Sequence, residues 1–131
     1  MSNLHGRKVL IVDDEPFMRI TIKAVLRAVD RFVVAEAEDG DTALDAVLTF
    51  KPDVVLCDVA MPRVDGLAFV ARLRQHQNMV VRGTPVVMLT GHADEETVLG
   101  AIRLQISGFL VKPVSPKALG AKLRGILAQA G

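Results

Sequence analysis

Five short apolar runs divide the chain at intervals of about 20 to 30 residues, and this alternation constrains the fold more than any other feature. The runs cover residues 9–12, 32–35, 54–57, 86–89 and 109–111. Continuous apolar runs rich in valine are typical of strands that are covered on both faces, as in a parallel sheet. We therefore expect five buried parallel strands.

The segments between these runs carry apolar residues at helical spacing. The stripes are Ile22, Val25, Leu26 and Val29; Leu44, Val47 and Leu48; Val70 and Leu73; Val98, Leu99 and Ile102; and Leu119, Leu123, Ile126 and Leu127. Strand and helix thus alternate five times, and right-handed crossovers wind such a chain into one parallel sheet with helices on both faces. The sequence predicts an α/β fold of this doubly wound type.

Residues that favour helix starts agree with these boundaries. The predicted starts are at Pro16, at Asp41 with Thr42, at Asp65 with Gly66, and at Ser115 with Pro116. Aspartate, serine and threonine accept hydrogen bonds from the free N–H groups of a first turn, and proline suits the first helical position. We expect helices to begin at these four places.

Length and composition indicate one domain. A chain of 131 residues can bury a core without disulfides, and the single Cys57 lies inside an apolar run, which favours a reducing, cytoplasmic location. We expect residues 1–131 to form one domain with its core in about 7–129 and no output domain. No apolar stretch reaches the ~20 residues of a membrane span. A net charge of +1 argues against direct nucleic-acid binding.

Polar residues follow four of the predicted strands at their carboxyl ends. Asp13 and Asp14 follow the first, Asp58 the third, Thr90 the fourth and Lys112 the fifth. Ligands of open parallel sheets bind beyond this edge. The sequence therefore predicts that three carboxylates, a hydroxyl and an ammonium group converge there.

This set of groups suits phosphoryl chemistry supported by a hard cation. Neighbouring carboxylates repel one another, and Mg²⁺ prefers one or two carboxylates together with a phosphate oxygen. With that charge balanced, Asp58 can attack phosphorus while Lys112 and the Thr90 hydroxyl hold the other phosphoryl oxygens. Taken alone, an Asp13-Asp14 pair after an apolar strand more often caps the following helix than binds a metal, and the convergence with Asp58, Thr90 and Lys112 favours the metal site.

At these positions the sequence resembles receiver domains of bacterial two-component response regulators, over residues 7–129. The motifs are Val12-Asp13-Asp14, Asp58-Val59-Ala60-Met61-Pro62 with Asp65-Gly66, Leu89-Thr90-Gly91, and Lys112-Pro113. The resemblance implies a flavodoxin-like (βα)5 sheet with strand order 2-1-3-4-5. It also implies a cytoplasmic signalling switch that is not an enzyme acting on a metabolite.

The resemblance further assigns roles residue by residue. Asp58 is the phosphoacceptor, Asp13 and Asp14 hold Mg²⁺ together with Asp58 and the carbonyl of Ala60, and the donor is a phosphohistidine of a histidine kinase or phosphotransfer protein. Thr90 is the switch hydroxyl, Lys112 binds the phosphoryl group, Phe109 is the switch aromatic, and the bond before Pro113 is cis.

Some positions depart from the commonest family pattern. Phe109 has no hydroxyl, so its ring can move inward without the hydrogen bond of a tyrosine, and ordinary core packing is the alternative. Ala60 and His92 occupy variable positions that tune the lifetime of the acyl phosphate in the family.

A Mg²⁺-dependent phosphohydrolase is one alternative function, but such an enzyme usually has a second carboxylate where this chain has Ala60. An FMN-binding flavodoxin needs a phosphate-cradling loop where this chain has acids, and an interaction module without phosphorylation remains a third alternative.

The charges are distributed unevenly. All 15 acidic residues lie between Asp13 and Glu96, whereas residues 97–131 carry five basic residues and no acid. A symmetric contact would bring like charges together. We therefore expect a monomer when unphosphorylated, no symmetric dimer through the C-terminal face when phosphorylated, and an acidic downstream effector. Pairing of those bases with Glu95 and Glu96 across a two-fold axis is the alternative, and a merely solvated basic face is another.

Overall fold

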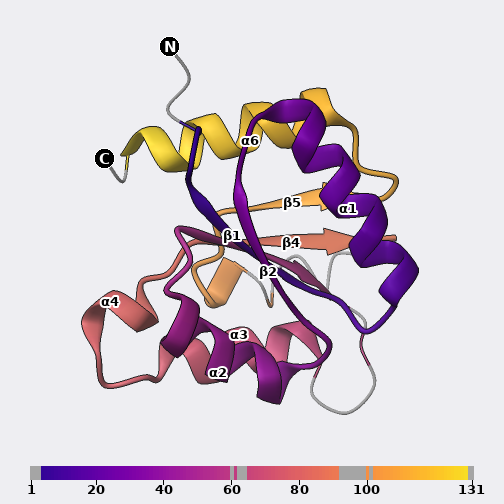
Figure 1. Ribbon diagram of the computed structural model, residues 1–131. Helices are drawn as coiled ribbons and strands as arrows, with labels where there is room; N and C mark the ends of the chain where they lie inside the picture. Colours follow the sequence, from indigo (N-terminus) through magenta and orange to yellow (C-terminus); the bar gives the residue numbers. More distant parts are fainter. Residues whose placement is uncertain (1–3, 60, 62–64, 92–99, 101, 130–131) are drawn as a thin grey trace.

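The computed structural model describes residues 4–59, 61, 65–91, 100 and 102–129. Its parallel sheet lies between two layers of helices (Figure 1). The strands are β1 (Lys8–Val12), β2 (Val33–Ala37), β3 (Val54–Asp58), β4 (Val86–Thr90) and β5 (Gly108–Val111). The labelled helices are α1 (Pro16–Val29), α2 (Gly40–Phe50), α3 (Gly66–Arg74), α4 (Met79–Arg82) and α6 (Pro116–Gln129).

The sheet has the strand order β2-β1-β3-β4-β5, and every neighbouring pair is parallel. This confirms the predicted doubly wound topology. Four strands match the predicted apolar runs to within one residue at each end, and β2 begins one residue later and ends two residues later than its run. β3 and β4 are buried at every position, as expected for central strands between two helix layers. The expectation of five buried strands is wrong for the two edge strands, because β2 buries only Ala37 and β5 has no fully buried residue.

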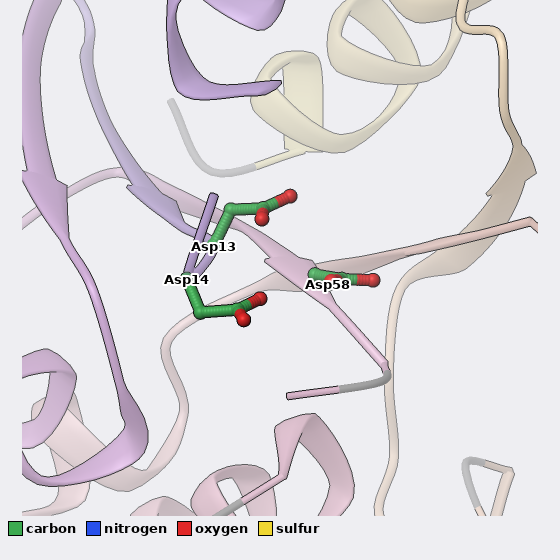
Figure 2. A group of neighbouring side chains, drawn as sticks. All are labelled: Asp13, Asp14 and Asp58. Carbon is green, nitrogen blue, oxygen red and sulfur yellow. The ribbon is translucent and has the colours of Figure 1, made fainter. Parts of the chain in front are cut away.

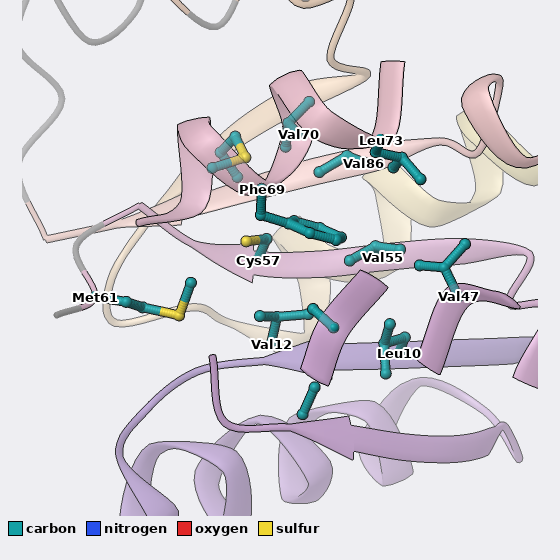
Figure 3. Packing of buried hydrophobic residues seen from close by; sticks show 13 residues of the cluster. Leu10, Val12, Val47, Val55, Cys57, Met61, Phe69, Val70, Leu73 and Val86 are labelled. Atoms are coloured by element: carbon teal, nitrogen blue, oxygen red, sulfur yellow. The ribbon is translucent and has the colours of Figure 1, made fainter. Parts of the chain in front are cut away.

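Alternate residues of the inner strands supply two separate cores. Residues such as Leu10, Val55 and Cys57 face α2 and α3, and Figure 3 shows this cluster. Their neighbours Ile11 and Leu56 lie in the second cluster, which α1 and α6 cover. Each such side chain contributes about 1.5 to 3 kcal/mol when it leaves water. The two cores hold the sheet rigid and fix where its carboxyl edge lies.

Most predicted helix starts are confirmed, but the start of α2 is wrong. Pro16 begins α1, Asp65 accepts a hydrogen bond from the N–H of Ala68, and Ser115 accepts one from the N–H of Ala118. The cap of α2 is Asp39, two residues before the predicted Asp41. Asp39 and Thr42 form a reciprocal capping box, which stabilises the earlier start.

Two other expectations need correction. The predicted apolar stripes are wrong at two described positions, because the side chain of Leu48 is 39% exposed and that of Ile102 is 61% exposed. The short helix α4 was not predicted. It is a single turn that buries none of its residues, and the side chain of Asn78 caps it.

Arg74 at the end of α3 ties α4 to more distant segments. Its guanidinium donates hydrogen bonds to four backbone carbonyls, at 2.7 to 3.2 Å. The acceptors are Arg82, Thr84, Leu104 and Gln105. Burial lowers the pKa of this arginine. Arg74 therefore joins the segment that leads into β5 to the segment that leads into β4.

Within the described part of the chain, no helix is both long enough and apolar enough to cross a membrane.

Candidate functional site

The structure brings the predicted acidic residues together at the carboxyl edge of the sheet. Asp13 follows β1, Asp14 comes next, and Asp58 is the last residue of β3. One carboxylate oxygen of each lies within 4.8 Å of one from the others (Figure 2). Asp13 is 1% exposed and Asp58 is 7% exposed, whereas Asp14 is half-buried. The cluster is thus seated on the apolar strands and opens to solvent on the side of Asp14.

Lys112 supplies positive charge to this cluster. Its Nζ lies 3.2 Å from Oδ1 of Asp58 and 3.5 Å from Oδ2 of Asp13. The peptide bond between Lys112 and Pro113 is cis, as the resemblance implies. The N–H of Lys112 donates to the carbonyl of Thr90 at 2.7 Å, so the β5 end is fastened to the β4 end. Lys112 therefore reaches two of the three carboxylates from a fixed backbone position.

Thr90 is the last residue of β4 and is 5% exposed. Its strand is the neighbour of β3, and Leu89 lies in register with Asp58. The predicted hydroxyl therefore comes from the strand next to the one that carries Asp58.

The contacts of Asp13 bear on the capping interpretation. Its Oδ1 accepts a hydrogen bond at 3.0 Å from the N–H of Glu15. Glu15 is itself the N-cap of α1, so this bond orders the loop before the helix and leaves the N–H groups of the first turn unaddressed. The position of Asp13 is better explained by the acidic cluster than by capping.

The donor set fits a hard divalent cation. Three carboxylates this close carry a formal charge of −3, and Lys112 balances one unit of it. Like charges at this separation repel one another, and a cation between them relieves the repulsion. Oxygen ligands from carboxylates, with one side open for water, match the preference of Mg²⁺. Asp13, Asp14 and Asp58 are the residues that can hold such an ion.

Gly66 supports this edge in a way that the sequence did not reveal. A Cβ atom at Gly66 would collide with the backbone carbonyl of Asp58 and with the side chain of Met88. The N–H of Gly66 also donates to the carbonyl of Val59 at 3.0 Å. The predicted turn at Asp65-Gly66 is therefore also a close approach of α3 to the end of β3, which only glycine permits.

Of the other predicted site residues, the structure describes Phe109 and leaves several outside the described part of the chain. Phe109 is half-buried and packs against the core cluster on the α2 and α3 side, so its switching role stays a prediction. Ala60, His92, Glu95 and Glu96 lie outside the described residues, as do Val98 and Leu99 of the predicted fourth helical stripe.

Cys57 lies directly before Asp58 and is fully buried. Burial raises the pKa of its thiol, and the nearby charges of Asp58 and Asp13 raise it further. A thiol in this state is a poor nucleophile and metal ligand. Cys57 therefore belongs to the core beneath the site.

The fold and the site together define a class of protein. The chain has a doubly wound α/β fold with strand order 2-1-3-4-5. At the carboxyl edge of its sheet, a carboxylate cluster contacts the lysine that follows β5.

Comparison with known proteins identifies the family. Residues 9–124 match the family model of the response regulator receiver domain. The chain is 37% identical over 120 residues to the probable transcriptional regulator ycf27 of Guillardia theta, covering 92% of this chain and 45% of that protein. It is 37% identical over 118 residues to the positive alginate biosynthesis regulatory protein of Pseudomonas aeruginosa, covering 88% and 45%. The chain belongs to the response regulator receiver domains.

Solved structures of related proteins have the same fold as this chain. The chemotaxis protein CheY4 of Vibrio cholerae superposes with a TM-score of 0.83 at 31% identity, covering 92% of this chain and 98% of that one. A putative response regulator from Chloroflexus aurantiacus gives 0.85 at 31% identity, covering 94% and 98%. The chain spans about half or less of the first curated relatives that it matches.

Proposed function

We propose that this receiver domain accepts a phosphoryl group on Asp58 from a phosphohistidine of a histidine kinase or phosphotransfer protein, in a Mg²⁺-dependent reaction. One observation carries the proposal. The Asp58 carboxylate lies at the carboxyl end of β3, in contact with Lys112 and next to two further carboxylates. Such a carboxylate is both held in place and provided with partners for an incoming phosphoryl group.

The transfer balances as follows. A carboxylate oxygen of Asp58 forms a bond to phosphorus, the bond between phosphorus and the donor imidazole nitrogen breaks, and its electron pair stays on that nitrogen. Lys112 lies close enough to follow the charge onto the phosphoryl oxygens, and the Thr90 hydroxyl is the proposed donor to another of them. When bound, Mg²⁺ offsets the repulsion between the cluster and the phosphoryl group. Asp13, Asp14, Asp58 and the carbonyl of Ala60 are the proposed ligands.

The phosphorylated state is read on the C-terminal side of the domain. Thr90 ends β4, and Phe109 on the neighbouring β5 is the proposed ring that moves when Thr90 turns toward the phosphoryl group. That motion shifts the balance between two arrangements of the surface formed by β5, α6 and the predicted helix that carries Val98, Leu99 and Ile102. The protein acts in this way as a switch rather than as an enzyme on a metabolite.

An acidic effector fits that surface. A groove of about 660 Å³ lies beside α6, and Lys122 lines it together with small residues such as Ala121 and Gly125. Opposite charge would accelerate encounter and make binding depend on salt. We place this exchange in the cytoplasm, which suits the free buried thiol of Cys57. The receiver unit comprises residues 1–131, with its core in about 7–129.

Intact mass spectrometry after incubation with a small phosphodonor tests the assignment. Wild type should gain one phosphoryl group with Mg²⁺ and none with EDTA, and Asp58→Asn should gain none under either condition. Asp45→Asn is the matched control because Asp45 is an exposed carboxylate on α2 that does not belong to the acidic cluster. A phosphoryl adduct that persists at the wild-type level in Asp58→Asn would refute the proposal.

A further inference from the structure

Arg19 on α1 reaches back to the loop that carries two of the three carboxylates. Its Nη1 donates to the backbone carbonyl of Asp13 at 2.7 Å, and its Nε donates to Oε1 of Glu36 at 3.1 Å. The side chain is 17% exposed. One guanidinium thus joins the end of β1 to a residue of β2 through two separate nitrogens.

The bond to Asp13 acts on both neighbouring acids. The carbonyl of Asp13 and the N–H of Asp14 belong to one planar peptide group, so fixing that carbonyl fixes the plane between the two residues. The preceding peptide is held as well, because the N–H of Asp13 donates to the carbonyl of Ala37 at 3.1 Å. With both planes held, the directions in which the two side chains leave the backbone are set.

Glu36 anchors the arginine to the sheet. It lies on β2 in register with Ile11 of β1, and its second oxygen accepts a hydrogen bond from Lys23 at 3.0 Å. The hydrogen bond from Lys23 and the contacts with Arg19 lower the pKa of Glu36, which keeps it charged. Arg19 is therefore braced from one side while it holds the Asp13 carbonyl on the other.

We propose that Arg19 is a positioning residue that sets the spacing of the Asp13 and Asp14 carboxylates for a divalent cation. This inference rests on the proposed function of the site. Arg19 touches neither the proposed ion nor the reacting atoms, and it acts through the peptide plane between its two acidic neighbours.

The positive charge of Arg19 should weaken Mg²⁺ binding, whereas the positioning of the two carboxylates should strengthen it. Because the two effects have opposite signs, they can be separated by experiment. A guanidinium near the cluster repels a cation, so removal of charge alone would tighten Mg²⁺ binding. Loss of positioning would weaken it. Arg19→Lys keeps the charge but offers one nitrogen where the arginine uses two in a fixed fork, so it separates the two effects. Lys23→Met is the matched control, because Lys23 shares Glu36 without touching the loop.

The experiment measures the dissociation constant of Mg²⁺ by isothermal titration calorimetry with magnesium chloride alone. Loss of groups that orient metal ligands weakens binding by about 10- to 100-fold, and Arg19 acts on backbone rather than on a ligand atom. We expect about tenfold weaker binding in both Arg19→Met and Arg19→Lys and an unchanged constant in Lys23→Met. Circular dichroism in EDTA establishes that each variant is folded, and Arg19→Lys decides the matter if Arg19→Met does not fold.

The outcomes are distinguishable. Binding in both Arg19 variants that equals or exceeds that of wild type would overturn the positioning role while leaving the site itself intact. Equal weakening in Lys23→Met would also overturn it, because the effect would then belong to the whole ion cluster. Wild type that binds no Mg²⁺ would instead refute the proposed function on which the inference rests.

Discussion

Removal of the charge on Asp14 should stabilise the metal-free protein. Asp14 is the most exposed of the three clustered acids, and Lys112 pairs with the other two. Asp14→Asn keeps the shape of the side chain and removes its repulsion of Asp58. The repulsion between Asp14 and Asp13 contributes less to the change in stability, because these sequence neighbours also lie close together in the unfolded chain.

The expected size follows from the separation of the carboxylate oxygens. The oxygens lie within 4.8 Å of one another, and two unit charges at that upper limit repel by about 3.5 kcal/mol at an effective dielectric constant of 20 and by about 0.9 kcal/mol in water. Asp14 is half-buried and Lys112 offsets part of the charge of Asp58, so the lower half of this range applies. We expect Asp14→Asn to raise the free energy of unfolding by about 1 to 2 kcal/mol, which corresponds to a rise of about 4 to 8 °C in Tm.

Thermal unfolding in EDTA at low salt measures this difference, with Asp45→Asn as the control for loss of an exposed carboxylate. High salt should narrow the gap between Asp14→Asn and wild type, because it screens the repulsion. Saturating Mg²⁺ should reverse the order, since the ion stabilises the protein that binds it more tightly. A Tm of Asp14→Asn below that of wild type in EDTA would refute the reasoning and assign Asp14 a structural role.

Three further outcomes follow from the packing and the charges. Gly66→Ala should lower the free energy of unfolding by about 2 kcal/mol or more in urea denaturation, because the new methyl group meets the backbone of Asp58; unchanged stability would contradict that close approach. Arg74→Met should cost about 2 to 3 kcal/mol through the loss of hydrogen bonds to four carbonyls, and Arg72→Met, whose partner is one exposed carboxylate, should cost less than 1 kcal/mol in the same assay. Sedimentation of the beryllofluoride-bound chain should show a monomer, and a tight dimer that Lys122→Glu abolishes would show that like charges do not keep this face apart.

The positions of the strands were predictable because short apolar runs mark them in the sequence, whereas the strand order came from the family resemblance. Each strand is a short apolar run, and α/β alternation with one crossover hand leaves few topologies. The acidic cluster and its lysine were predictable for the same reason, since Asp13, Asp58 and Lys112 each stand where a predicted strand ends. A residue at that place needs no long-range information to be brought to the common edge.

The start of α2 and the presence of α4 were not predicted correctly, and the causes are partly local and partly long-range. The start of α2 was predicted at Asp41 because aspartate there also suits a first turn, and the choice of Asp39 depends on a reciprocal pair of hydrogen bonds with Thr42. The single turn of α4 buries no residue, so no apolar stripe announces it. Its position depends on the cap by Asn78 and on carbonyls that Arg74 holds from another helix.

The supporting residues Arg19 and Gly66 could not be found by the same reasoning. Both act through backbone groups of the site, a carbonyl of Asp13 and a carbonyl of Asp58, rather than through functional side chains. A sequence pattern marks which residue types stand at a strand end, but it does not mark which distant group fixes the peptide plane beneath them. This is why the side chains that meet at the strand ends were predictable, whereas Arg19 and Gly66, which hold the backbone beneath them, were not.

The apolar strands beneath the site also explain how its electrostatics can work. Cys57, Leu56 and Val12 are fully buried, so the bases of Asp13 and Asp58 lie against a medium that screens charge poorly. In that setting the contact of Lys112 with Asp58 is stronger than on an open surface, and so is the repulsion within the cluster. The two apolar cores stabilise the fold enough to tolerate this repulsion without metal. Under the proposed function, this unrelieved negative charge is what a divalent cation would neutralise at the carboxyl edge of the sheet.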